Sequence, residues 1–117
     1  ARPQKHGYVY WVTAPDGRIL FEKRGEKGML GGTIGLPTSE WVEKGAARGH
    51  LPLKSRKETK ILVKHVFTHF ELELQGIAVT MNDNGMPKGG DYFWATRQEA
   101  LKLGIPTLFK KALRQFI

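Results

Sequence analysis

The chain has 117 residues, which is enough for one domain and too few for a second hydrophobic core. Its 19 lysine and arginine residues outnumber its 11 aspartate and glutamate residues, and the net charge of +8 favours polyanionic partners such as nucleic acid. The absence of cysteine excludes disulfides, thiolate metal sites and a cysteine nucleophile, and no apolar run approaches the roughly 20 residues that a membrane-spanning helix needs.

The N-terminal part of the chain predicts a β-hairpin followed by a loop. Residues 1–6 are basic and start at an alanine, so we expect the end of a linker from an upstream segment. Aromatic and β-branched residues at 8–12 and alternating residues at 18–24 are typical of strands, and Pro-Asp-Gly at 15–17 suits the turn between them. The five glycines at 25–35 are too many for a regular element, so a loop is predicted there.

The central part predicts a helix, a second loop and two strands. The helix is expected to begin at the N-cap residue Thr38 and to end near Gly45 or Gly49. Residues 50–60 contain a proline and a dense basic run, which favours a loop. Two strands are predicted next, and the second alternates apolar with polar residues as a half-buried strand does; they cover residues 61–70 and 71–81.

The C-terminal part predicts a short strand and two helices. The strand is Tyr92–Trp94, and Thr96 is placed to cap a helix that extends to Leu103. The last helix covers residues 108–116 and has one apolar stripe, formed by Leu108, Phe109, Ala112, Leu113 and Phe116. Mixed strands with few helices indicate a single α+β domain over residues 1–117.

Two readings are open for the glycine segment Gly28, Met29, Leu30, Gly31 and Gly32. The glycines could meet a need for positive φ in a loop, or they could bring backbone N–H groups close to a phosphate. No Lys-Ser or Lys-Thr pair follows them, so the segment is not a nucleotide-binding P-loop.

The hexapeptide from His65 to Phe70 combines aromatic residues, two histidines and a hydroxyl group. On a strand His65, Phe67 and His69 share one face, whereas a turn at Thr68 would break that pattern and project the hydroxyl outward. The two histidines would lie more than ~10 Å apart on a strand, so a shared metal ion is not expected. From the residues alone, an aromatic strand end with partly satisfied histidines explains the segment equally well.

Together these segments resemble the C-terminal, Nudix-like domain of MutY-type adenine DNA glycosylases, enzymes of base excision repair that remove adenine paired with 8-oxoguanine. Phe67-Thr68-His69 is similar to the family's Phe-Ser-His triplet, and residues 28–32 to its Gly-Leu-Leu-Gly-Gly stretch. Leu36-Pro37 and the closing segment 105–113 also match, so the resemblance covers nearly the whole chain. Ile34 and Gly35 depart from the family's Trp and Glu, and contacts of those side chains are not carried over.

The resemblance implies a Nudix-like α/β/α sandwich with a mixed β-sheet, and a partner, duplex DNA with 8-oxoguanine paired with adenine. It assigns the lesion contact to Thr68 and the support of that contact to Phe67 and His69. Phosphate contacts are expected from the backbone of residues 28–32 and from the basic stretch, which consists of Lys54, Arg56, Lys57, Lys60 and Lys64.

The resemblance also implies what this part of the protein leaves to other parts. No catalytic residue, metal site or cofactor is expected here, because adenine excision and an iron–sulfur cluster belong to the family's N-terminal catalytic domain. That domain is the expected partner in cis. We further expect a monomer in the bacterial cytoplasm, associated with the nucleoid.

Two alternatives from other functional classes are open. A Nudix hydrolase of nucleoside diphosphates needs a carboxylate-rich helix of the form Gly-x5-Glu-x7-Arg-Glu-x-x-Glu-Glu to hold divalent metal ions. The segment around Glu40 and Glu43 has two glutamates and neither an Arg-Glu nor a Glu-Glu pair. The second alternative is a protein-interaction module, for which DNA affinity would be insensitive to salt.

Overall fold

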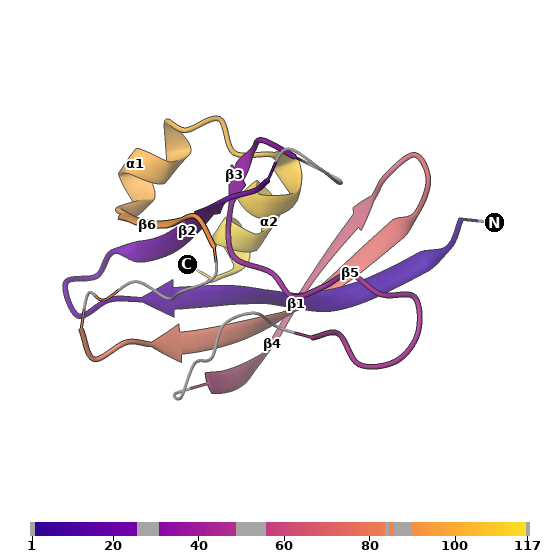
Figure 1. The fold of residues 1–117 in the computed structure, drawn as a ribbon, viewed down its shortest axis with the longest axis horizontal. Coiled ribbons are helices and arrows are strands. Elements are labelled where there is room, and N and C mark those ends of the chain that lie inside the picture. Colours follow the sequence, from indigo (N-terminus) through magenta and orange to yellow (C-terminus); the bar gives the residue numbers. More distant parts are fainter. Residues whose placement is uncertain (1, 26–30, 49–55, 84, 86–89, 117) are drawn as a thin grey trace.

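The computed structural model describes residues 2–25, 31–48, 56–83, 85 and 90–116, with Arg56 described only in its backbone. These residues form a set of β-strands and, near the C-terminus, two helices (Figure 1). The strands and helices are β1 (Gln4–Thr13), β2 (Ile19–Lys23), β3 (Ile34–Gly35), β4 (Arg56–Val66), β5 (Glu71–Thr80), β6 (Tyr92–Ala95), α1 (Arg97–Leu101) and α2 (Thr107–Phe116).

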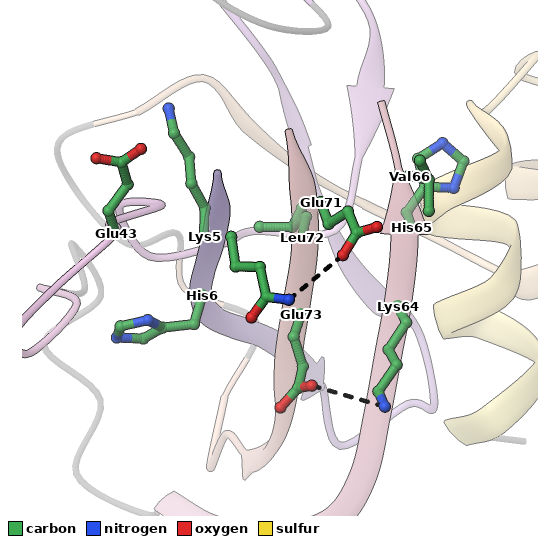
Figure 2. A pocket seen from close by; sticks show the side chains of 10 residues that line it. Lys5, His6, Glu43, Lys64, His65, Val66, Glu71, Leu72 and Glu73 are labelled. Carbon is green, nitrogen blue, oxygen red and sulfur yellow. Dashed lines mark hydrogen bonds and ion pairs between the residues drawn. The ribbon is translucent and has the colours of Figure 1, made fainter. Parts of the chain in front are cut away.

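The strands form one mixed sheet in the order β3-β2-β1-β5-β4, with β6 paired to β2. The central strands β1 and β5 are parallel over ten residue pairs, and every other pairing between strands is antiparallel. The register places His6 of β1 beside Glu73 of β5, with Lys64 of β4 on the other side of Glu73 (Figure 2). The predicted α+β class with a mixed sheet is confirmed.

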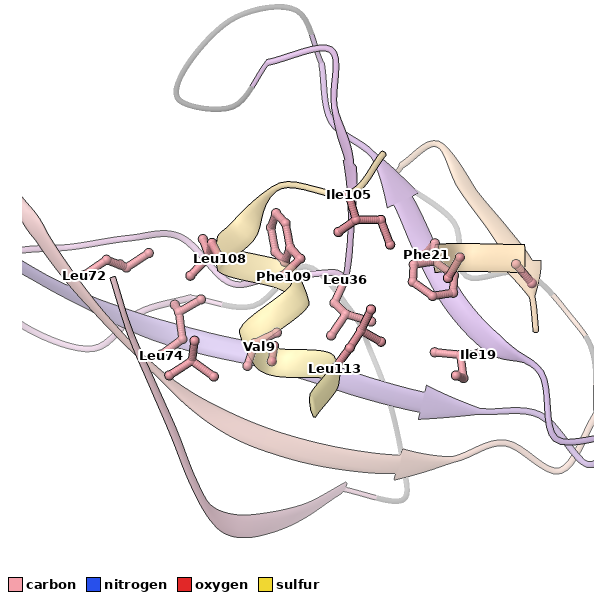
Figure 3. Packing of buried hydrophobic residues seen from close by; sticks show 14 of the residues in the cluster. Val9, Ile19, Phe21, Leu36, Leu72, Leu74, Ile105, Leu108, Phe109 and Leu113 are labelled. Atoms are coloured by element: carbon pink, nitrogen blue, oxygen red, sulfur yellow. The ribbon is translucent and has the colours of Figure 1, made fainter. Parts of the chain in front are cut away.

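The hydrophobic core lies mainly between the sheet and α2. Phe109 and Leu113 of α2 meet Val9 of β1, Leu74 of β5 and Leu36, and all five side chains are at most 2% exposed (Figure 3). Burying one such side chain contributes about 1.5–3 kcal/mol. Phe116, at the end of the same apolar stripe, stacks on the indole of Trp11 at 5.1 Å. The predicted amphipathic helix at the C-terminus is therefore confirmed.

The opposite face of the sheet carries a second buried cluster. Its members alternate along the strands with those of the first cluster, and they are Tyr10, Val12, Leu20, Ile77, Val79 and Tyr92. Both described helices contribute to the first cluster, α1 through Ala100 and α2 through Phe109. The described part of the chain therefore has helices on one face of the sheet.

Helix α1 is capped as the sequence predicts. The Thr96 hydroxyl accepts a hydrogen bond from Glu99 N at 3.1 Å, and the Glu99 carboxylate accepts one from Thr96 N at 2.9 Å. This reciprocal pair is a capping box. The helix ends at Leu101, two residues before the predicted Leu103. Neither described helix is long and apolar enough to cross a membrane.

The helix predicted from Thr38 is wrong. Residues 37–42 are extended and run antiparallel to β1, with hydrogen bonds from Tyr10 N to Pro37 O, from Ser39 N to Tyr8 O and from Val42 N to His6 O. Ser39 Oγ, expected to help cap a helix, instead accepts from Tyr8 N at 2.8 Å. This segment pairs with the edge of β1 that β2 leaves unpaired except at Thr13. Leaving the buried N–H and C=O groups of that edge without hydrogen bonds would cost more free energy than forming the helix would gain.

Three strand boundaries also differ from the prediction. Strand β4 begins at Arg56, so residues 56–58 pair with β5 and residues 59–61 form a bulge in the same strand, where a loop was predicted. It ends at Val66, because the chain turns before Phe70. Residues 4–6, assigned to a linker, are the first residues of β1. In each case pairing with β5 decides the conformation, which local composition does not reveal.

Candidate nucleic-acid interface

A tight turn from Phe67 to Phe70 joins β4 to β5. Phe67 N donates to Phe70 O at 2.8 Å, which closes the turn and leaves Thr68 and His69 exposed at its tip. Of the two arrangements that the sequence left open, the structure therefore has the turn. The hydroxyl and the imidazole expected at the lesion are both accessible to a partner.

Three aromatic side chains, Trp41, Phe67 and Phe70, pack together at the base of this turn, and we call this cluster the aromatic cradle. The Trp41 ring lies 5.9 Å from Phe67 and 6.1 Å from Phe70, and the two phenylalanine rings lie 4.8 Å apart. Phe70 is only 7% exposed. Each such pair contributes about 0.5–1.5 kcal/mol beyond the area that it buries. The cradle therefore fixes both ends of the turn while its tip stays exposed.

Three cations surround the cradle and the turn. Arg2 Nε donates to Thr68 O at 3.3 Å, so the N-terminal residues hold the backbone of the turn directly. Lys5 Nζ lies 4.6 Å from the centre of the Phe70 ring, and the Arg24 guanidinium lies 4.9 Å from that of Trp41. Arg2 and Lys5 therefore contact the turn directly, and Arg24 reaches it through Trp41, whereas the sequence analysis had not assigned phosphate contacts to any of the three.

Arg24 also forms the base of the glycine loop. Its N donates to Thr33 O at 2.8 Å, and its carbonyl accepts from Gly32 N at 3.1 Å. Gly32 has a φ of 78°, so the interpretation that this loop requires positive φ is confirmed at that residue. The Gly32 N–H is directed to carbonyls of the loop itself. Gly28, Met29 and Leu30 lie outside the described residues, and Gly31 is half-buried.

The Arg24 side chain lies in an environment that is unusual for a guanidinium. It is half-buried, Nη1 donates to Thr38 Oγ1 at 3.4 Å, and the Phe109 ring lies 5.9 Å away. Burial lowers the pKa of Arg24, and the nearby Glu22 carboxylate opposes that shift. Burying a charge costs free energy unless contacts compensate, and here aromatic faces and a hydroxyl supply those contacts.

The sequence analysis missed Arg24, and the helix that it predicted from Thr38 included Trp41. The contacts that matter join positions 24, 38, 41 and 67, which are distant along the chain. An arginine directly before a glycine-rich loop is the sequence signal that could have drawn attention to Arg24. Nothing in the local pattern would have revealed Trp41, because its contacts depend on residues 37–42 being extended.

The basic stretch of the sequence is not gathered around the turn. Lys57 and Lys60 are exposed near the start of β4, and at about 3.3 Å per residue Lys57 lies roughly 30 Å from the turn. Lys64 lies closer, but its Nζ is 3.8 Å from Glu73 Oε2. Lys54 lies outside the described residues, and Arg56 is described only in its backbone.

His65 connects β4 to α2. Its Nδ1 lies 3.0 Å from Lys111 Nζ, and that ammonium also donates to Lys64 O at 3.2 Å. Burial lowers the pKa of His65, and the charge of Lys111 lowers it further, so the imidazole is neutral at pH 7 and accepts from the ammonium. The ring also meets the edge of Phe67 at 4.8 Å, so His65 supports the cradle.

A shallow pocket of about 360 Å³ opens beside the strands that lead into the turn (Figure 2). It contains cationic and acidic groups in similar number, among them His6, Lys64, Glu43, Glu71 and Glu73. Gln4 Nε2 donates to Glu71 Oε2 at 3.5 Å, and His6 Nε2 donates to Gly45 O at 2.8 Å. Within the described ranges no three side chains form a group able to hold a metal ion.

Comparison with known proteins places this arrangement in a family. The model of the NUDIX domain family matches residues 8–115. No curated protein sequence matches the chain.

Solved structures show the same fold at low identity. The C-terminal domain of mouse MUTYH, solved in complex with human PCNA, is similar with a TM-score of 0.72 and 18% identity, over 96% of this chain and 86% of that one. A MutT protein from Methanosarcina mazei gives 0.71 and 13%, over 98% and 94%. RenU, a Nudix hydrolase from M. smegmatis, gives 0.61 and 14%, over 99% and 84%. Identities this low show the fold alone.

Proposed function

The chain belongs to the NUDIX domain family, and we propose that it is the 8-oxoguanine-recognition domain of an adenine DNA glycosylase, which binds duplex DNA in which 8-oxoguanine pairs with adenine. The observation that carries the proposal is the turn at Thr68. An exposed hydroxyl stands at the tip of a turn that aromatic rings hold from below, and cations surround it.

The chemistry of the lesion suits this hydroxyl. 8-Oxoguanine differs from guanine by an oxygen on C8 and a proton on N7. A threonine hydroxyl both donates and accepts, so Thr68 can accept a hydrogen bond from the N7 proton or donate one to the C8 oxygen, two groups that guanine lacks. The turn backbone is closed by the Phe67–Phe70 hydrogen bond and held by Arg2, so little ordering is needed on binding. His69 shares the exposed tip and supports the contact.

Phosphate contacts position the duplex. The net charge of +8 provides attraction and counterion release, and we assign contacts to the glycine loop and to Lys57 and Lys60 along β4. Because Lys57 and Lys60 lie ten and seven residues before Phe67, at most roughly 33 and 23 Å along the strand, they contact phosphates away from the lesion. They raise affinity for every duplex alike. Lys64, paired with Glu73, contributes less than a free lysine would.

The glutamates favour recognition over hydrolysis. Glu40 lies on extended chain and Glu43 in the bend that follows it, so their carboxylates are not presented at helical spacing toward one metal site. Adenine removal is then the task of a catalytic domain linked in cis, which also holds the iron–sulfur cluster. Magnesium-dependent turnover of 8-oxo-dGTP or ADP-ribose by this chain would instead establish the hydrolase.

The proposal is tested by equilibrium binding to two duplexes of one sequence, with either 8-oxoguanine or guanine opposite adenine. We expect tighter binding of the damaged duplex, with both affinities falling as salt rises. Equal affinity for the two duplexes at every salt concentration would contradict lesion recognition by this domain. Affinity that does not change with salt would favour the protein-interaction module.

A further inference from the structure

The Arg24 guanidinium is held in place by two aromatic rings and one hydroxyl group. Its central carbon lies 4.9 Å from the centre of the Trp41 ring and 5.9 Å from that of Phe109. Its N–H donors lie in the guanidinium plane, and Nη1 donates to Thr38 Oγ1. A planar donor fork fixed in this way matches a phosphate, which accepts two parallel hydrogen bonds.

The same side chain connects the glycine loop to the turn. The Arg24 backbone closes the loop through Gly32 and Thr33, and its side chain stacks on Trp41, which stacks on Phe67. Two ring contacts, of 4.9 and 5.9 Å, therefore separate the guanidinium from the first residue of the turn. The sum of these two distances is the largest separation that they allow, and it corresponds to at most about three base-pair steps of B-DNA at about 3.4 Å each.

We propose that Arg24 binds a phosphodiester of the strand whose damaged base contacts Thr68, and that Trp41 is the positioning residue that fixes the distance between these two contacts. The inference rests on the proposed function and adds a phosphate site to it. Arg24 holds a phosphate within about three nucleotides of the lesion. Lys57 and Lys60 contact phosphates much farther away.

Because Arg24 is half-buried, its contact with a phosphate should contribute more to binding affinity than the contact of an exposed lysine. A half-buried guanidinium has already lost part of its hydration, so less water must be displaced when a phosphate arrives. Salt also screens such a pair less than it screens an exposed one. Lysine can replace the charge but not the planar fork or the stacking on Trp41.

The test is a double-mutant cycle between the protein and the DNA backbone. One partner is the wild-type domain, Arg24→Gln or Arg24→Lys, and the other is an 8-oxoguanine duplex with a single neutral methylphosphonate, moved one position at a time around the lesion. We expect Arg24→Gln to weaken binding of the 8-oxoguanine duplex without a methylphosphonate about tenfold, or about 1.4 kcal/mol, and Arg24→Lys to weaken it less. At one position near the lesion, the methylphosphonate should weaken wild-type binding and leave Arg24→Gln unaffected.

The positioning role of Trp41 is tested by whether the methylphosphonate effect stays confined to one phosphate. Trp41→Phe keeps an aromatic ring and should preserve the sensitive position, whereas Trp41→Leu should spread the sensitivity over several phosphates. Trp11→Leu is the matched control, because it removes the stack on Phe116 away from the turn and should leave the pattern unchanged. Thermal unfolding shows whether each variant is folded. If Arg24→Gln is unfolded, the methylphosphonate scan is carried out with Arg24→Lys.

The outcomes separate this inference from the proposed function. Equal binding of damaged and undamaged duplexes by the wild-type domain overturns the proposed function. If the wild-type domain discriminates but the Arg24 and methylphosphonate effects add at every position, the Arg24 contact is wrong. If Trp41→Leu keeps the sensitive position of the wild type, the positioning role of Trp41 is wrong.

Discussion

Replacing Gly35 by alanine tests whether the core and the interface are packed as described. Gly35 lies in β3 opposite Glu22, and a Cβ at that position would meet Phe109 Cδ2 and Cε2 at 2.4 Å. Phe109 is 0% exposed and its ring contacts the Arg24 guanidinium. The residue that stands here in place of the family's glutamate therefore leaves room for the ring that supports Arg24.

The magnitude follows from the displacement that the methyl group requires. Ordinary contacts begin at 3.4 Å, so the ring must move by about 1 Å from a position at 2.4 Å, inside a packed core. Overpacking of this kind costs about 1–3 kcal/mol, and the lower chain entropy of alanine in the unfolded state offsets about 0.4–1 kcal/mol. We expect Gly35→Ala to lower the free energy of unfolding by about 1–2 kcal/mol, which lowers Tm by about 4–8 °C.

Urea unfolding followed by tryptophan fluorescence measures this change. Gly25→Ala is the matched control, because its Cβ would meet nothing within 4 Å, and we expect it to be as stable as the parent or more stable by up to about 1 kcal/mol. Phe109→Leu shortens the side chain that clashes. In the double variant the cost of Gly35→Ala should therefore shrink, with a favourable coupling of about 0.5–3 kcal/mol.

Two results would refute this reasoning. One is a Gly35→Ala variant as stable as Gly25→Ala, which would mean that the Phe109 ring has free space. The other is strict additivity of Gly35→Ala and Phe109→Leu, which would mean that the two residues are not in contact.

Three further predictions concern the interface and the sheet. Thr68→Ser should keep the preference for the damaged duplex and Thr68→Ala should reduce it about three- to tenfold in the binding assay; an unchanged preference in Thr68→Ala would remove Thr68 from recognition. The double variant Lys57→Gln, Lys60→Gln should lower the slope of log affinity against log salt by about 2 for damaged and undamaged duplexes alike; a loss confined to damaged DNA would contradict their distant position. Burial, and then the Glu22 carboxylate, raise the pKa of Tyr92 to about 12 from an unfolded value of about 10, so stability should fall as pH rises from about 10 to about 12. Tyr92→Phe should remove that part of the alkaline loss in urea unfolding, and an unchanged pH profile would contradict the raised pKa.

The sequence predicts well those elements whose signals are local. The apolar stripe of α2 and the N-cap residue Thr96 depend on spacings within a few residues, and both are present as expected. The positive φ of Gly32 is also a local requirement. Such features depend little on what the rest of the chain does, so one sequence is enough to find them.

The failures occur where a distant strand decides the conformation. Thr38 and Ser39 are good helix N-caps, but β1 has an edge that needs partners, and this segment supplies them. Residues 56–60 look like a basic loop until β5 pairs with them. Neither competitor is visible in a local window, because loop closure brings together residues that lie far apart in sequence.

The candidate site divides in the same way. Thr68 and its neighbours are singled out by a short motif, but the sequence leaves open whether they form a strand or a turn. The roles of Arg24 and Trp41 arise from contacts between segments far apart in the chain, and one of those segments was assigned to the wrong element. A basic run in the sequence also suggested phosphate contacts at β4, while the structure shows that cations nearer the turn come from scattered positions.

The central claim, that this domain reads the damaged base, is tested most directly by an amide-shift titration with two duplexes. One carries 8-oxoguanine paired with adenine and the other guanine paired with adenine. The account predicts shifts near Gly31, Thr68 and His69 that are larger for the damaged duplex. Diffuse shifts that are equal for both duplexes and disappear with added salt would contradict it, because the domain would then supply only a basic surface.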